Sequence, residues 1–296
     1  MISINFWVIH QNEEVFRKDT LVDYSVAVKY HEQIENTNFD DLIRSIFYTN
    51  RQPLFFIITA IIFVLVEKSQ LIACLISQLF LILSIFSTYK LGTYLTDKTK
   101  GLTAALLTAT FPIVFATSRV FKYEISALAL LPISIYFLFK SENFQNQKFS
   151  FLFGISFGIG MLFRETYIIF LGGPLLVYVL GSLIKSKLNI RNVMIVLLVF
   201  SLISLPYYIS SSDIILSDVK GDLTRSYVSF DYISFENFSY YFNHLPEQIT
   251  PIFTVLFVIS LLVLAINLKE LNLKDITTVS WFLFPYFVFT FVVPYN

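Results

Sequence analysis

Asp23 is the first residue of this chain whose type and setting suit proton transfer. It lies in the stretch Leu-Val-Asp-Tyr-Ser-Val-Ala-Val-Lys-Tyr, at the start of what we expect to be an amphipathic helix. A carboxylate flanked by apolar residues and partly removed from water has a raised pKa and can accept a proton. The alternative is an ordinary solvated carboxylate on a helix surface, and the residue types leave both interpretations open.

Three further stretches combine arginines with carboxylates. Arg51 precedes Pro53 and an apolar run, 54–66, and a proline near the first turn of a helix would place Arg51 where an anionic group can bind. Arg119 and Glu124 share one short stretch, and Arg164 and Glu165 are adjacent. Each has a simpler alternative: Arg51 binds lipid phosphate nonspecifically, and Arg164 is neutralised by Glu165 or Glu124.

The elements that must position these residues are helices that cross a membrane. The chain is 56% hydrophobic and 14% charged, and its mean hydropathy is +0.69, which is typical of an all-α polytopic membrane protein. We expect about eight crossings, because apolar stretches of near-spanning length recur along the chain: 70–89, 102–117, 125–139, 149–163, 166–184, 192–209, 251–268 and 277–294.

The linkers between these stretches alternate in charge. Lysine and arginine concentrate in every second linker, and because such residues favour the cytoplasmic side, those linkers are expected inside: Lys90, Lys98, Lys100, Lys140, Lys148, Lys185, Lys187, Arg191, Lys269 and Lys274. The other linkers are acidic and carry Glu124 and Glu165. The carboxylates therefore gather on the outer face, where we expect the chemistry.

Two outer segments are long. We expect residues 1–69 to form an outer segment with juxtamembrane helices, in which 54–66 is interfacial because an apolar run of thirteen residues is too short to span. Residues 70–296 form the transmembrane bundle, with an outer loop at 210–250. Since the chain must begin outside on this topology, we expect a preceding helix to be missing from this sequence.

At this point the arrangement resembles the GT-C glycosyltransferases, specifically the relatives of dolichyl-phosphate-mannose–protein mannosyltransferase, over about residues 20–294. Asp23 and Tyr24 stand where that family has an Asp-Glu-x-x-Tyr-like stretch, without the second acid. Arg51-Gln-Pro-Leu stands for a His-Pro-Pro-Leu-like motif and keeps only Pro-Leu.

The later motifs follow in the family's order. Gly101-Leu-Thr-Ala-Ala-Leu-Leu matches a Gly-x-x-Ala-Ala-Leu-Leu stretch, and Ser118-Arg119 is followed by Glu124 at a position that is usually Asp. A Gly-x-x-x-Gly-x-x-x-Leu-x-Arg-Glu pattern ends in Arg164 and Glu165. The family continues past the last helix, so we expect the chain to be truncated at Asn296 as well.

The resemblance implies a GT-C-like helix bundle in the plasma membrane whose active face is extracytoplasmic. It implies an inverting transfer of a sugar from a polyprenyl-phosphate donor to a hydroxyl of a protein or glycolipid acceptor. Asp23 and Glu124 would be catalytic, Asp23 as the base, and a divalent cation (Mg or Mn) is a further expectation. Substrate would be held by Arg51, Arg119, Arg164 and Glu165.

Two other functions remain open from the sequence. A polytopic transporter would have ionisable residues buried at the bilayer midplane and paired broken helices. A non-catalytic membrane fragment of a transferase would keep the helices without the activity. Nucleic-acid binding is excluded by the lack of a basic run, of zinc-ligand spacing and of a Gly-rich phosphate loop.

Overall fold

The computed structural model describes residues 18–217, 235–267 and 271–292, and these residues form helices joined by short connections, without a strand. The N-terminal group comprises α2 (Lys18–Glu35), α3 (Phe39–Phe47) and α4 (Leu54–Leu65). The bundle that follows comprises α5 (Gln70–Leu95), α6 (Lys98–Thr110), α7 (Pro112–Ser118), α8 (Glu124–Lys140), α9 (Gln147–Phe163), α10 (Tyr167–Ile184), α11 (Ile190–Ser210), α13 (Phe235–Ile266), α14 (Leu273–Phe287) and the π-helix η3 (Val288–Val292).

The prediction of an all-α polytopic membrane protein is confirmed. Among the described residues, four helices are long and apolar enough to cross a membrane: α5, α10, α11 and the Ile249–Ile266 part of α13. The bent pair of α6 and α7 gives a fifth span if the two count together. Helices α8, α9 and α14 occupy the other three predicted crossings but have only 15 to 17 residues, so the number eight stays a prediction.

The predicted crossing at 102–117 is wrong as a single helix. It is divided into α6 and α7, whose axes differ by 61°. Phe111 lies between them with φ −58° and ψ 124°, because a residue before proline avoids the helical region. Pro112 then begins α7, where its missing N–H costs nothing.

Polar side chains fix where several helices begin. Asp97, Asn146 and Asn189 each accept a backbone N–H of the helix that follows. The hydrogen bond from the backbone of Lys100 is the main cause that lowers the pKa of Asp97. All three caps lie in the basic linkers, so these linkers are compact and the helices leave them in defined directions.

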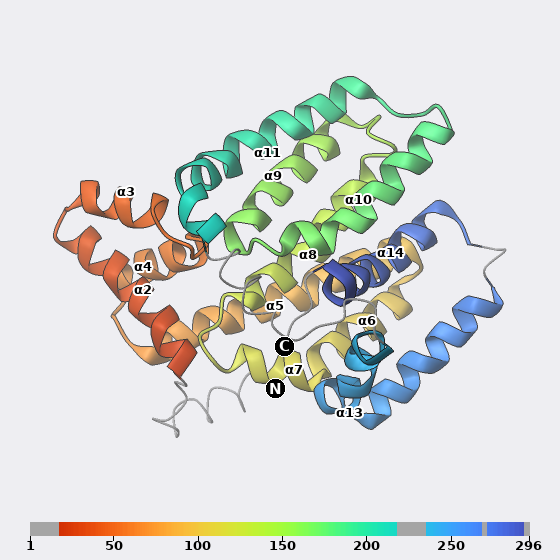
Figure 1. Cartoon of the computed structure of the whole chain (residues 1–296), viewed down its shortest axis with the longest axis horizontal. Helices are drawn as coiled ribbons and strands as arrows, with labels where there is room; N and C mark the ends of the chain where they lie inside the picture. Colours follow the sequence, from red (N-terminus) through yellow and green to blue (C-terminus); the bar gives the residue numbers. More distant parts are fainter. Residues whose placement is uncertain (1–17, 218–234, 268–270, 293–296) are drawn as a thin grey trace.

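The helices alternate in direction, so that their ends gather in two groups (Figure 1). One group contains α2, α3 and α4, the start of α8 and the ends of α9 and α11. The opposite group contains the end of α5, the end of α8 and the starts of α9, α11 and α14 (Figure 1). Side chains that are far apart in sequence therefore meet at one end or at the other.

The run 54–66 forms a helix that lies against α2. Helix α4 has 12 residues and spans about 18 Å at 1.5 Å per residue, against roughly 30 Å of hydrocarbon. Phe55, Phe56 and Phe63 are buried, whereas Leu65 at its end is exposed. Helix α4 is therefore shorter than a span, and its interfacial position stays a prediction.

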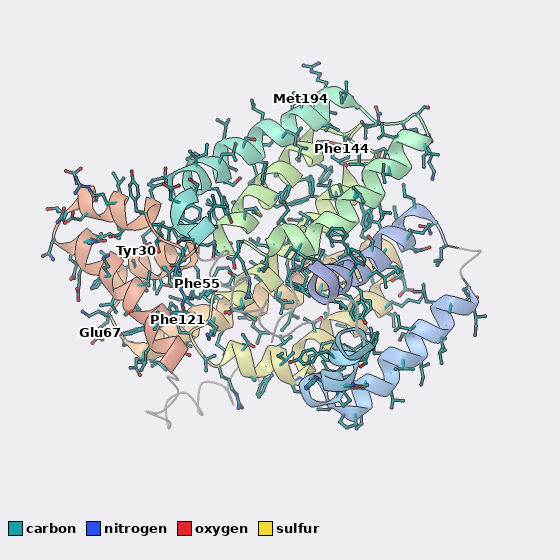
Figure 2. The ribbon with its side chains drawn as sticks, viewed as in Figure 1. Tyr30, Phe55, Glu67, Phe121, Phe144 and Met194 are labelled. Atoms are coloured by element: carbon teal, nitrogen blue, oxygen red, sulfur yellow. The ribbon has the colours of Figure 1, made fainter. Side chains whose placement is uncertain are left out.

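Two hydrophobic clusters join the helices. The first joins α2, α4, α5 and the start of α8 around Phe55 and Phe121, and the second joins α8, α9, α10 and α11 around Phe144 and Phe153. Figure 2 shows Phe55 and Phe121 near the N-terminal helices and Phe144 at the far end of the bundle. Because helices in a bilayer associate mainly through van der Waals packing, the close contacts within each cluster hold the helices together.

Adjacent glycines in α10 provide a test of this packing. A Cβ on Gly173 would contact the Cβ of Phe284 and lie 2.7 Å from the backbone oxygen of Ser280 on α14. We expect Gly173→Ala to lower the free energy of unfolding by about 1–3 kcal/mol, because overpacking cannot be relieved there. Gly172→Ala is the control: its Cβ would lie 3.4 Å from its nearest neighbour, so stability should be unchanged or higher. Thermal unfolding in detergent measures both, and equal effects would contradict this packing.

Candidate functional site

Asp23 is fully buried, with 0% of its surface exposed. It lies in the second turn of α2 on the face that packs inward, together with Thr20, Ala27, Tyr30 and His31, which are all buried. These positions recur at helical spacing, so one face of α2 is covered while Ser25 and Lys29 stay exposed. The interpretation of Asp23 as a solvated surface carboxylate is therefore wrong.

Two cations flank the Asp23 carboxylate. The Arg51 Nη1 atom lies 3.1 Å from Asp23 Oδ1 and donates a hydrogen bond to it. The Lys122 Nζ atom lies 3.9 Å from Asp23 Oδ2. A buried carboxylate is costly unless it is paired, and these two charges offset that cost. Both cations remain partly exposed, with side chains 33% and 23% accessible.

A second ion pair joins α8 to the end of α9. Arg164 Nη1 lies 3.3 Å from Glu124 Oε1, and Arg164 Nε donates to Thr166 Oγ1 at 2.9 Å. Glu124 is the first residue of α8, where the positive end of the helix dipole also favours a carboxylate. The expected neutralisation of Arg164 by an adjacent acid is therefore present, with Glu124 as its partner.

Tyr123 lies in sequence between Lys122, which approaches Asp23, and Glu124, which pairs with Arg164. Its ring is also near both arginines of the site. The Arg164 and Arg51 guanidinium carbons lie 5.5 Å and 6.0 Å from the centre of its ring, within the range of a cation–π interaction. Burial, and then the charges of Glu124 and Glu165, raise the pKa of Tyr123 to about 12. The phenol is therefore neutral at ordinary pH and can only hydrogen-bond or stack.

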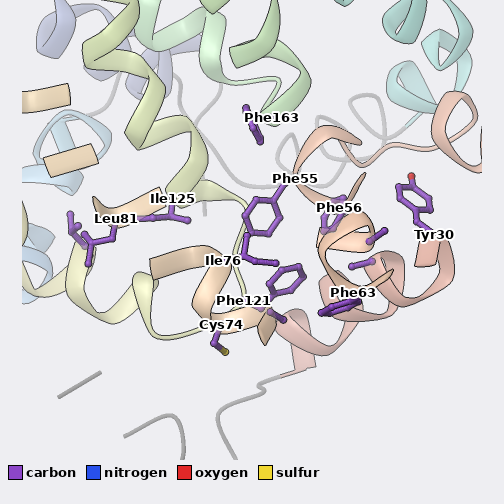
Figure 3. Close-up of a cluster of buried hydrophobic side chains, with 14 residues drawn as sticks. Tyr30, Phe55, Phe56, Phe63, Cys74, Ile76, Leu81, Phe121, Ile125 and Phe163 are labelled. Carbon is purple, nitrogen blue, oxygen red and sulfur yellow. The ribbon is translucent and has the colours of Figure 1, made fainter. Parts of the chain in front are cut away.

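Aromatic packing brings these charges together. Phe121, Ile125 and Phe163 are buried in one cluster, and each is the sequence neighbour of a charged residue: Lys122, Glu124 and Arg164. The Phe55 ring packs against Phe121 with 4.9 Å between their centres. Figure 3 shows Phe55, Phe121, Ile125 and Phe163 in this cluster. The packing of these apolar side chains therefore determines the positions of Lys122, Glu124 and Arg164.

Arg51 lies in the connection between α3 and α4, and residues that are distant in sequence hold this connection in place. Tyr207 donates from its hydroxyl to the Thr49 carbonyl at 3.1 Å, and Ser211 Oγ donates to the Phe47 carbonyl at 2.7 Å. Both lie at the end of α11. Because these bonds join residues more than 150 positions apart, no local sequence pattern indicates them.

The other two predicted site residues are placed differently. Arg119 stacks over Phe115, with 4.1 Å from its guanidinium carbon to the ring centre, rather than beside Asp23. Glu165 is exposed at the turn between α9 and α10, and its charge reaches Tyr123. Asp23, Arg51, Glu124 and Arg164 thus meet at one place, with Glu165 at its edge.

Sequence reasoning missed Lys122 and Tyr123. Both lie between Arg119 and Glu124 in the same short stretch. The sequence therefore contains a second cation, Lys122, three residues after the predicted Arg119. The Ser118-Arg119 motif favours Arg119 as the cation, whereas Lys122 is the residue that approaches Asp23. Among the described residues no three His, Cys, Asp or Glu side chains gather as metal ligands.

Comparison with known proteins identifies one family. The family model for dolichyl-phosphate-mannose-protein mannosyltransferases matches residues 50–205. The matched segment contains Arg51, Lys122, Glu124 and Arg164, whereas Asp23 precedes it. No curated protein and no solved structure matches the chain.

The Asp23–Arg51 pair has a testable energetic consequence. We expect Arg51→Ala to lower the free energy of unfolding by about 2 kcal/mol, because it removes the closer of the two cations from a buried carboxylate. Adding Asp23→Asn should recover most of the loss, since the charge that needed pairing is gone. Unfolding in denaturing detergent measures this cycle, with exposed Arg44→Ala as a control expected to change stability by less than about 0.5 kcal/mol. A double variant as unstable as the sum of the single variants would show that the pair is not coupled.

Proposed function

Since this chain belongs to the dolichyl-phosphate-mannose-protein mannosyltransferase family, we propose that it transfers a sugar from a polyprenyl-phosphate donor to an acceptor hydroxyl. The family is one of membrane glycosyltransferases, and the chain has several helices that can span a bilayer. The acceptor is a hydroxyl of a protein or of a glycolipid. Transfer takes place at the end of the bundle where Asp23 lies, which we assign to the extracytoplasmic face of the plasma membrane.

The observation that carries this proposal is a buried carboxylate between two partly exposed cations. Asp23 has 0% exposure, while Arg51 and Lys122 extend from it toward the surface. Transfer from a lipid phosphate needs a base for the acceptor proton and positive charge for the departing phosphate. This site supplies both within one constellation.

The reaction we propose is a single displacement with inversion. The acceptor oxygen attacks the anomeric carbon of the sugar while Asp23 takes the hydroxyl proton. The new bond forms between that oxygen and the anomeric carbon, and the bond from the anomeric carbon to the phosphate oxygen breaks. The electron pair leaves with the polyprenyl phosphate. A positioned base of this kind accelerates a reaction by about 10²–10⁴-fold.

Arg51 and Lys122 link donor binding to the base. In this structure they neutralise Asp23, and they are also the nearest cations for a donor phosphate. When these two cations turn toward the phosphate, the positive charge around Asp23 decreases. Its carboxylate then becomes a better proton acceptor. Bidentate contacts from arginine and point contacts from lysine suit a phosphate group.

Glu124 and Arg164 act as a second unit in this proposal. Glu124 holds Arg164 in place through their 3.3 Å ion pair, and Arg164 stabilises the phosphate as its charge grows. Glu124 then acts through Arg164 rather than by touching the sugar. Arg119 and Glu165, at the margin of the site, contact the donor or the acceptor away from the reacting atoms.

The divalent cation expected from the sequence stays a prediction. Asp23 and Glu124 are each paired with cationic side chains, a donor set that leaves little carboxylate charge for a metal ion. No step proposed above passes through a metal. Activity with and without a chelator tests this expectation.

Transport receives less support. It predicts paired broken helices, and the described residues contain one pair of helices sharply bent at a short break, α6 and α7. Asp23 lies on α2, outside the candidate spans, and Glu124 lies at the start of α8 rather than midway along it.

We expect Asp23→Asn to lower sugar transfer by at least about 10²-fold, because the amide cannot accept the proton. The measurement is transfer from radiolabelled polyprenyl-phosphate sugars in membranes containing the native chain or the variant. Asp40→Asn removes an exposed acid of α3 and should leave the rate unchanged. Full transfer by Asp23→Asn would refute its role as base, and no transfer by the native chain would refute the proposed activity.

Lys122→Gln should raise the KM for the donor roughly tenfold while changing kcat less, since one charge-assisted contact to the phosphate is lost. Lys68→Gln provides the control, because Lys68 pairs with Glu32 at an exposed site. Steady-state kinetics with varied donor concentration separate the two constants. A loss confined to kcat would place Lys122 in the chemical step and contradict a role in donor binding.

A further inference from the structure

A second cluster of charged and aromatic side chains lies at the opposite end of the bundle. Tyr94 lies near the end of α5, Lys140 ends α8, and Lys274 lies in the first turn of α14. The Lys274 and Lys140 ammonium nitrogens lie 4.4 Å and 4.8 Å from the centre of the Tyr94 ring. Lys274 Nζ also donates to the Tyr94 hydroxyl at 3.3 Å.

These two lysines have no carboxylate partner among the described residues. Each ammonium group lies more than the 4.0 Å of an ion pair from every described carboxylate oxygen, although Lys100 and Asp97 form such a pair nearby. Asp275, next to Lys274, accepts the backbone N–H of Asn272 in a capping box. Lys140 and Lys274 are also partly buried, unlike the exposed Lys148 and Lys185.

Two ammonium groups at one aromatic ring repel each other. The ring attracts each cation through its negative face but carries no net charge, so the repulsion is only partly offset. A phosphate group that reaches both ammonium groups would neutralise them and accept hydrogen bonds from them. The chemistry of the cluster therefore fits a phosphate.

We propose that Tyr94, Lys140 and Lys274 bind the phosphate of an anionic phospholipid in the leaflet opposite to the Asp23 site. Tyr94 and Lys140 lie at the ends of α5 and α8, where lipid head groups meet a membrane protein. Because these helix ends lie at the depth of the lipid head groups, the cluster meets phosphates that are already attached to acyl chains, which favours a lipid over free phosphate.

The test uses the full chain purified in detergent and titrated with phosphatidylglycerol, with bound lipid counted by native mass spectrometry. We expect the double variant Lys140→Gln/Lys274→Gln to bind the tightest lipid at least tenfold more weakly. The loss of even one charge-assisted contact gives a change of about this size. Lys148→Gln/Lys185→Gln removes the same charge at the same end and should bind as the native chain does. Equal losses in both double variants, or none in either, would overturn the proposal.

Inorganic phosphate distinguishes the source of the ligand. We expect it to displace bound phosphatidylglycerol only at concentrations far above that of the lipid, because it lacks an acyl chain. Displacement at equal concentration would overturn the assignment to a lipid and leave a site for free phosphate.

A measurement on the unmodified protein guards against a misfolded variant. Bound phosphatidylglycerol should slow acetylation of Lys140 and Lys274 at least tenfold, while Lys148 and Lys185 react at an unchanged rate. Peptide mass spectrometry gives the rate at each lysine. Equal protection of all four lysines would point to a nonspecific detergent–lipid layer and overturn the site.

Discussion

The structure of the candidate site depends on one buried negative charge. Asp23 is removed from water at the interior face of α2, and its burial is tolerable because Arg51 and Lys122 approach it from two other segments. The connection between α3 and α4, the connection between α7 and α8, and the end of α11 are therefore arranged around it. These ion pairs of Asp23 can also break when a phosphate attracts the same cations.

Apolar packing makes that arrangement possible. The cluster around Phe55, Phe121 and Phe163 lies directly beneath the charged residues, and each of these aromatic side chains is close in sequence to one of them. Because interiors are closely packed, a buried aromatic side chain restricts the position of the charged residue beside it. The alternating directions of the helices place the ion pairs of Asp23 and Glu124 at one end of the bundle and the Tyr94, Lys140 and Lys274 cluster at the other.

Much of this could be predicted because it depends on local sequence. Helix lengths follow from apolar runs, and the site stretches containing Asp23, Arg51, Glu124 and Arg164 were recognised from residue type. The bend between α6 and α7 was missed, although Pro112 marks it. Pro132 and Pro174, in contrast, lie inside unbroken helices, so the consequence of each proline depends on its packing. Lys122 was missed because its distance from Asp23 depends on how helix α2 packs against the connection between α7 and α8.

The sequence by itself determined the helical class, the membrane setting and the residues available for chemistry, since hydropathy and charge act along the chain. Tertiary structure alone decided which charges meet. It paired Asp23 with Arg51 and Lys122 and Glu124 with Arg164, turned Arg119 away, and placed Lys140 and Lys274 at one ring. The physical reason is that ion pairing falls off within a few ångströms, whereas sequence patterns locate a side chain only to within a helical turn.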